Sequence, residues 1–266
     1  MEKVEKIDVQ AEIDKERPTE YWPDYNHFIS QFPCLDDLPA EYRSRASALL
    51  WSFRHVFFNT DRPDQFRAGI KMSPVVIDRI PGCQPKKEKV QQINKKKETH
   101  LKNHISSLLE RGVIVETENV VGCYASNVHI VMEQRFIASK NAVVEKSRAT
   151  ADCREINKCL VESSYTLPNM EQFRRECTEN GAKVFSNFDA TEYYHQIPID
   201  QECARQNFNI MALGKFYTFL KGLQGCKCLP SIAQKVSDTA FSSTDSSRAF
   251  LDDINTRSPD AETHLE

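Results

Sequence analysis

The stretch AFLDDINT, residues 249–256, places two adjacent carboxylates, Asp252 and Asp253, between apolar neighbours. Adjacent carboxylates repel each other, and an Asp-rich turn at the tip of a hairpin is the ordinary explanation for such a pair. A second stretch, VFSNFD, has the pattern of an apolar strand that ends in Asp189. If the two strands are neighbours, three carboxylates meet at one sheet edge, where their pKa values would rise.

A divalent cation would resolve this repulsion, because carboxylate oxygens are the ligands that Mg²⁺ prefers. Two such ions about 4 Å apart promote in-line phosphoryl transfer. One ion activates the attacking hydroxyl, and the other holds the triphosphate. Aspartates with apolar flanks are a weak pattern by themselves, so the surrounding residues must decide between a metal site and a plain turn.

Composition limits the classes of function. The 266 residues are 40% hydrophobic and 27% charged, as in ordinary globular proteins, and the net charge of -3 excludes a globally basic nucleic-acid binder. The sequence has neither a membrane-spanning apolar run nor a signal peptide. We therefore expect an intracellular protein, cytoplasmic or nuclear and not secreted, with no membrane partner. The nine cysteines lack zinc-ribbon spacing. In a reducing intracellular compartment we expect them to be free thiols and not disulfides.

Residue patterns predict the organisation of the chain. Residues 1–40 are charged and rich in proline and read as a tail or linker, and residues 41–111 read as a helical extension. From residue 112 onward, short β-like runs are mixed with helical ones, which predicts an α+β domain with a largely antiparallel sheet. We predict helices at 41–58, 86–111, 169–179 and 231–241, and strands at 113–115, 128–131, 142–144, 148–153, 183–189, 207–211 and 216–220.

Six blocks, in the same order along the chain, resemble reverse transcriptases. FSNFDATEYYHQIPID (185–200) resembles the first catalytic block of that family, and AFLDDINTRS (249–258) its YxDD block, with Phe250 in place of the usual Tyr. QGCKCLPSIAQ (224–234) keeps every spacing of a QGxKxxPxxxQ block. The remaining blocks are RATADCREINK (148–158), SSYTLPNMEQ (163–172) and LLERGVIVETENVVGCYASNVHIVM (108–132). The layout is closest to the pol region of gypsy-type LTR retrotransposons, which is related to the retroviral enzymes.

The resemblance implies reverse-transcriptase-like fingers and palm over residues 112–266, with an antiparallel palm sheet. It implies Asp189 and Asp252 as the main metal ligands and Asp253 as a less direct third carboxylate. The metal would be two Mg²⁺ ions, for which Mn²⁺ can substitute. The implied activity is RNA-directed DNA polymerase, a nucleotidyltransferase that adds dNTPs to a primer 3′-OH on an RNA or DNA template. The remainder of a pol polyprotein is a further implied partner.

The resemblance also implies residues that bind the incoming nucleotide. Tyr194 stands where the family keeps an aromatic steric gate against the ribose 2′-OH, and a packed core aromatic is the alternative. Arg148 matches an arginine that grips the triphosphate. Gln224 matches a glutamine that contacts the nucleotide, and Gly225 lets the backbone approach closely. Lys140 stands near the position of a phosphate-binding lysine.

Departures from the family pattern leave two alternatives. The hairpin before Arg148 is longer and less basic than in the family, the proline of the LPQG element is missing, and the chain ends soon after Asp253. We therefore expect a C-terminally truncated domain without thumb or RNase H. An inactive retroelement remnant with weak nucleic-acid binding is the first alternative. A metal-dependent nuclease is the second, disfavoured by Tyr194 and the QGCKCLP block.

Two further patterns are open or weak. The basic run from Lys86 to Lys97 fits template phosphates and a solvated helix face equally well. His100 and His104 are four residues apart but lack the Glu of HExxH, so we interpret them as a surface pair and not as a zinc site.

Overall fold

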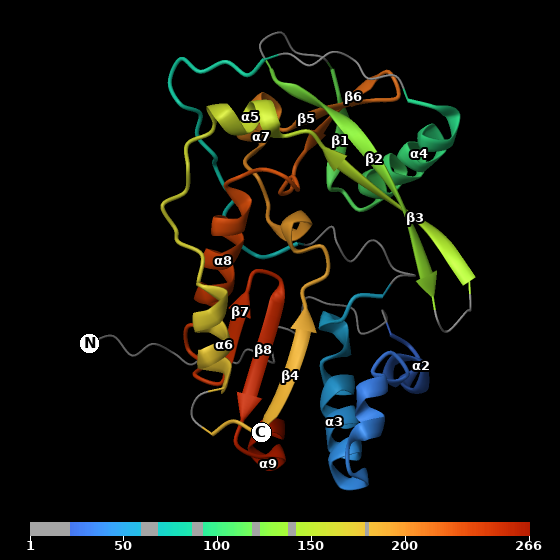
Figure 1. Ribbon diagram of the computed structural model, residues 1–266, viewed down its shortest axis with the longest axis vertical. Helices are drawn as coiled ribbons and strands as arrows, with labels where there is room; N and C mark the ends of the chain where they lie inside the picture. Colours follow the sequence, from blue (N-terminus) through green and yellow to red (C-terminus); the bar gives the residue numbers. More distant parts are fainter. Residues whose placement is uncertain (1–21, 60–68, 87–92, 119–122, 138–141, 179–180) are drawn as a thin grey trace. The chain divides into compact units, whose positions relative to one another are not determined.

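The computed structural model describes residues 22–59, 69–86, 93–118, 123–137, 142–178 and 181–266 (Figure 1). The described residues fall into two compact units. The smaller unit draws on segments within 1–63, 181–184 and 258–266, and the larger on segments within 64–180 and 185–257. No helix among the described residues is long and apolar enough to cross a membrane.

The smaller unit is helical and is held together by aromatic side chains. Phe28 is fully buried, and four rings surround it at centroid distances of 5.1 to 5.7 Å, those of Trp22, Phe32, Trp51 and Phe57. Its elements are α2 (Tyr25–Ile29), η2 (Pro33–Asp37), α3 (Ala40–Ser52), η3 (Arg54–Val56) and α9 (Ala261–Leu265).

The prediction of a tail through residue 40 is therefore wrong from Trp22 onward. Burial of the aromatic rings outweighs the high charge and proline content of this segment, because each buried ring removes a large apolar area from water. The domain boundaries at residues 40 and 111 stay a prediction.

A five-stranded sheet forms one part of the larger unit. Its strand order is β1-β6-β5-β2-β3, and all neighbours are antiparallel except β2 and β5, which are parallel. The strands are β1 (Ile114–Thr117), β2 (Ala125–Ile137), β3 (Ala142–Ala151), β5 (Asn209–Ala212) and β6 (Lys215–Phe219). The runs predicted separately at 142–144 and 148–153 thus belong to the one strand β3.

Helix α4 (Lys95–Glu110) contacts this sheet and begins later than the predicted start at residue 86. Asn94 caps its first turn by accepting a hydrogen bond from the Lys97 N–H at 2.9 Å. The helix ends at a C-cap glycine. Gly112 has a φ of 66°, and the next N–H, that of Val113, donates to the Leu108 carbonyl at 2.9 Å.

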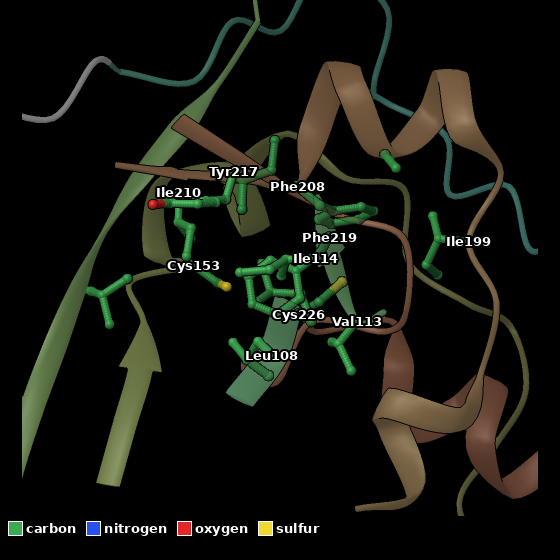
Figure 2. Packing of buried hydrophobic residues seen from close by; sticks show 14 of the residues in the cluster. Leu108, Val113, Ile114, Cys153, Ile199, Phe208, Ile210, Tyr217, Phe219 and Cys226 are labelled. Atoms are coloured by element: carbon green, nitrogen blue, oxygen red, sulfur yellow. The ribbon is translucent and has the colours of Figure 1, made fainter. Parts of the chain in front are cut away.

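The core of the larger unit lies between this sheet and its helices, where side chains from distant segments meet (Figure 2). Leu108 and Ile114 from the end of α4 and β1 are fully buried beside Phe208 and Ile210. The flanking helices are α5 (Arg154–Cys159) and α7 (Gln201–Asn207).

A three-stranded sheet forms the other part, in the order β4-β8-β7. Its strands are β4 (Val184–Asp189), β7 (Ser247–Phe250) and β8 (Asp253–Ser258). Strand β4 runs antiparallel to β8, as their arrows show in Figure 1, and β8 runs antiparallel to β7. Helices α6 (Met170–Thr178) and α8 (Leu229–Ala240) contact β7. The predicted α+β fold, with an antiparallel palm sheet, is confirmed.

The expectation of free thiols is wrong for one pair of cysteines. Cys83 and Cys159 form a disulfide, with Cα atoms 5.3 Å apart. The extended segment before Cys83 lies against the end of α5, where the Ile80 N–H donates to the Cys159 carbonyl at 2.8 Å. This pairing brings together two thiols that are 76 residues apart in sequence. Among the cysteines whose side chains the structure describes, the free ones are Cys34, Cys123, Cys153, Cys203, Cys226 and Cys228.

Candidate functional site

The three predicted carboxylates lie at the same end of the three-stranded sheet. Asp189 ends β4, Asp253 begins β8, and Asp252 occupies the two-residue turn between β7 and β8. The Ala190 N–H donates a hydrogen bond to the Asp252 carbonyl at 2.8 Å, which joins the end of β4 to the turn. The strand that ends in Asp189 is not a direct neighbour of β7, because β8, the return strand of the hairpin, lies between them. The three carboxylates nevertheless lie at one end of the sheet, as the sequence suggested for neighbouring strands.

The carboxylates repel one another. Partial burial, and then the negative charges of Asp252 and Asp253, raise the pKa of Asp189 above its ordinary value. All three residues are exposed to solvent, and no basic side chain in the described segments forms an ion pair with them. The negative charge of these three carboxylates is therefore not neutralised by a basic side chain of the described segments.

The donor chemistry fits a hard divalent cation, since three carboxylates supply oxygen ligands and their repulsion favours cation binding. The three carboxylates are, however, farther apart than the ligands of a closed metal site. Within the described parts of the chain, no three His, Cys, Asp or Glu side chains are grouped closely enough to hold a metal ion.

Tyr194 lies beside this cluster. It belongs to η6 (Tyr193–Gln196), is half-buried, and packs against two hydrophobic clusters. Burial, followed by the charge of Asp252, raises the pKa of its hydroxyl. The ring is thus both a packed aromatic and a group within electrostatic reach of Asp252, and the role of steric gate stays a prediction. Gly222 makes room here, because a Cβ at this position would lie 2.6 Å from the Tyr194 carbonyl.

Asn157, to which the sequence patterns assigned no role, shapes the loop at Gln224 and Gly225. Gly225 has a φ of 98°, a conformation that favours glycine. The Asn157 amide donates to the Gly225 carbonyl at 2.8 Å and accepts from the Lys227 N–H at 3.0 Å. This clamp ties α5 to the loop. The sequence signal that could have identified Asn157 is its place in the RATADCREINK block, as the asparagine of that block.

Arg148 lies on β3, opposite Val131 of β2. Its side chain is 53% exposed and forms an ion pair with Glu133 at 3.8 Å. No hydrogen bond or ion pair among the described residues joins Arg148 to the carboxylates or to Gln224. Lys140 lies outside the described residues.

The weaker predictions are partly resolved. Lys95, Lys96 and Lys97 form the first turn of α4, whereas Lys87 and Lys89 lie outside the described residues. The interpretation of His100 and His104 as a surface pair is wrong, because α4 packs against β1, β2 and β3. The His100 Nδ1 lies 3.0 Å from the Ser147 hydroxyl of β3. Burial, assisted by the charges of His195 and Arg111, lowers the pKa of His104 to about 4.

No protein-family model matches the chain. The chain is 32% identical over 114 residues to the "Retrovirus-related Pol polyprotein from transposon 412" of Drosophila melanogaster, which covers 43% of the chain and 9% of that relative. It is 24% identical over 246 residues to the corresponding polyprotein from transposon 297 of the same organism, covering 89% of the chain and 21% of the relative. The "Enzymatic polyprotein" of Figwort mosaic virus is 28% identical over 151 residues.

Solved structures agree in fold. The foamy viral protease-reverse transcriptase in complex with an RNA/DNA hybrid matches with a TM-score of 0.73 at 15% identity, over 92% of this chain and 30% of that one. The native prototype foamy virus enzyme matches with a TM-score of 0.72 at 17% identity. The chain spans about a tenth to a fifth of the length of the Pol relatives.

The predicted relationship is therefore confirmed. The sequence is related to retrovirus-related Pol polyproteins of transposons, and the fold is that of a reverse transcriptase. The narrower assignment to gypsy-type elements stays a prediction, as does the intracellular location.

Proposed function

We propose that this chain is the fingers and palm part of an RNA-directed DNA polymerase, which adds dNTPs to a primer 3′-OH. One observation carries the proposal. In a reverse transcriptase fold, the end of β4 and the β7–β8 turn bring Asp189 next to Asp252 and Asp253, and partial burial together with their charges raises the pKa of Asp189. Carboxylates that repel one another at this end of the sheet are costly to stability unless a cation binds between them, so their grouping indicates a cation-dependent function.

Asp189, Asp252 and Asp253 would hold Mg²⁺, or Mn²⁺ as a substitute. When bound, the metal supplies positive charge for the attacking hydroxyl and for the leaving phosphate oxygen. The carboxylates would contribute oxygen ligands, and the turn would contribute by presenting Asp252 beside Asp189 without a large rearrangement. The Ala190–Asp252 hydrogen bond supports this part of the proposal.

The nucleotide would lie between the fingers and the carboxylates. Arg148 and Lys140 would bind phosphate oxygens, for which the planar multi-donor guanidinium of Arg148 is suited. Tyr194 would contact the sugar, and its nearness to Asp252 supports this role. Gln224 would contact the nucleotide from the loop that Asn157 clamps, with Gly225 allowing close backbone approach.

The proposed partners are a primer on an RNA or DNA template, and the remainder of a Pol polyprotein. The solved relatives support the first of these, because foamy viral protease-reverse transcriptase has been seen in complex with an RNA/DNA hybrid and with double-stranded DNA. We extend this to the present chain on the basis of the shared fold.

A non-catalytic retroelement remnant is the second candidate. The open spacing of the carboxylates favours it, because no three potential ligands among the described residues are grouped closely enough to hold a metal ion. Such a protein would bind nucleic acid weakly and incorporate no nucleotide.

Primer extension on poly(rA)/oligo(dT) with Mg²⁺ or Mn²⁺ separates the two candidates. The wild-type chain is compared with Asp252→Asn, which keeps the size of the side chain and removes its charge. Incorporation above the level of this variant supports the polymerase. Equal incorporation in both proteins supports the remnant.

A further inference from the structure

The turn that carries Asp252 has an unfavourable backbone. Only Leu251 and Asp252 separate β7 from β8, and Leu251 has a φ of 55°, in the left-handed region. In two-residue hairpins that position favours glycine, and a residue with a Cβ costs about 1 kcal/mol more there. Contacts outside the hairpin must therefore hold the turn in this shape.

Gln234 of α8 supplies the first of these contacts. Its side chain is completely buried, with 0% exposure. Its Oε1 accepts from the Leu251 N–H at 2.8 Å, and its Nε2 donates to the Ala249 carbonyl at 2.9 Å. The second Nε2 hydrogen donates to the Asp238 carboxylate at 2.9 Å. A buried amide is costly unless hydrogen-bonded, and here its donors and one acceptor site are all used.

Ser237, three residues further along α8, supplies the second contact. Its hydroxyl donates to the Leu251 carbonyl at 3.1 Å, which leaves its oxygen free to accept from the Tyr193 hydroxyl at 2.7 Å. The Tyr193 hydroxyl also lies 3.0 Å from the Ala233 carbonyl. Tyr193 precedes Tyr194 in the chain. Through Ser237, one helix thus contacts both the carboxylate turn and the segment of the aromatic residue.

From these contacts we infer that Gln234 and Ser237 are positioning residues, which hold the Leu251–Asp252 turn in its left-handed conformation and fix it relative to Tyr194. Without Gln234, the Leu251 N–H and Ala249 carbonyl lose their buried partner, and Leu251 can relax to a negative φ. Asp252 then turns away from Asp189. The catalytic consequence of this inference rests on the proposed polymerase function, whereas the structural consequence does not.

The test compares Gln234→Leu with Gln172→Leu. Gln172 is a matched control, because it also lies on a helix and donates to a carboxylate four residues ahead, Glu176 at 2.9 Å, but it is exposed. Amide hydrogen exchange of Leu251 is measured in the full chain, with amides of β5 and β6 as reporters of global folding. We expect exchange at Leu251 to accelerate at least about tenfold in Gln234→Leu only.

Primer extension supplies the second readout. We expect the kcat of Gln234→Leu to fall by about 10- to 100-fold with little change in the KM for dNTP, because a small misplacement of a reacting group lowers the rate of chemistry. Ser237→Ala removes one hydrogen bond to the turn, together with the contact to Tyr193, and should show a smaller change of the same kind. It also serves as the test variant if Gln234→Leu accelerates exchange in β5 and β6 as well.

The outcomes separate the two proposals. Unchanged exchange at Leu251 in both variants overturns the positioning role. Faster exchange with an unchanged kcat overturns the link to catalysis. Faster exchange in a protein whose wild type incorporates no nucleotide supports the positioning role and contradicts the polymerase function. Faster exchange with a lower kcat supports both.

Discussion

Two hairpins of the larger unit carry side chains of the proposed site, and they differ in how firmly they hold them. The β7–β8 hairpin is short, and hydrogen bonds from α8 and Ala190 hold its turn. The β2–β3 hairpin has strands of 13 and 10 residues, and its Arg148 is half-exposed with one ion pair at 3.8 Å. If the proposed function is correct, the carboxylates are positioned before a substrate binds, whereas Arg148, the side chain proposed to bind phosphate, can adjust to it.

The largest effect should come from removing a charge in the rigid hairpin. Asp252→Asn should lower primer extension by at least about 100-fold, because a metal ligand in the proposed site is lost. Asp245→Asn, an exposed aspartate before β7, is the control and should retain activity. Comparable losses in both variants would contradict a special role for the hairpin carboxylates.

Acid should destabilise the larger unit through His104 of α4. The pKa of His104 on α4 is lowered to about 4 from the ordinary 6.5, so the unfolded chain binds a proton that the folded chain rejects. The free energy of unfolding should therefore fall as pH decreases from 6.5 to about 4, by on the order of 2 kcal/mol after allowance for the partly exposed ring. Denaturant unfolding at pH 7 and pH 4.5 measures this change.

His104→Gln is the matching variant for the pH prediction. It should flatten the decrease between pH 6.5 and 4, because glutamine does not titrate. A slope equal to that of the wild type would assign the pH dependence to other titratable groups, among them His195 and Glu192, which act electrostatically on this ring.

Arg148→Ala should act on binding and not on chemistry. We expect the KM for dNTP to rise about tenfold with kcat nearly unchanged, since one charged hydrogen-bonding group is worth about 1.5 kcal/mol or more. Gln234→Leu should show the reverse division. If Arg148→Ala lowers kcat as strongly as Gln234→Leu does, the contrast between the two hairpins is wrong.

The smallest effect should come from the partner of Arg148. Glu133→Gln removes the ion pair that competes with phosphate for the guanidinium. Exposed ion pairs contribute at most about 1 kcal/mol, so the KM for dNTP should fall about two- to threefold. Steady-state kinetics at two salt concentrations checks this, because added salt should reduce the difference between the two proteins.

The local sequence pattern was sufficient to predict the strands and the turn that carry the carboxylates. Apolar runs that end in Asp189 and Asp252 predicted β4 and the β7–β8 hairpin, because alternation and a terminal turn residue are properties of the segment itself. The family resemblance then identified the fold. The roles of Arg148, Tyr194 and Lys140 come from the same resemblance and stay predictions, and Lys140 also lies outside the described residues.

Tertiary contacts could not be predicted from the same patterns. Gln234 looks like any polar residue of a helix until the packing of α8 buries it beneath the turn. Cys83 and Cys159 have no local signal, because the pairing depends on the path of an extended segment 76 residues away. Around Phe28, charge and proline content predicted a tail, and only the assembled rings make a core.

The hydrogen bonds from α8 to the turn also bear on the order of folding. They join residues only 14 to 17 positions apart, whereas the side-chain contact between Asn187 of β4 and Asn255 of β8 spans 68 positions. Closing a short loop costs less chain entropy than closing a long one. The helix and the hairpin after it therefore form a sequence-local module, and we expect its turn to form before β4 joins the sheet and completes the group of carboxylates.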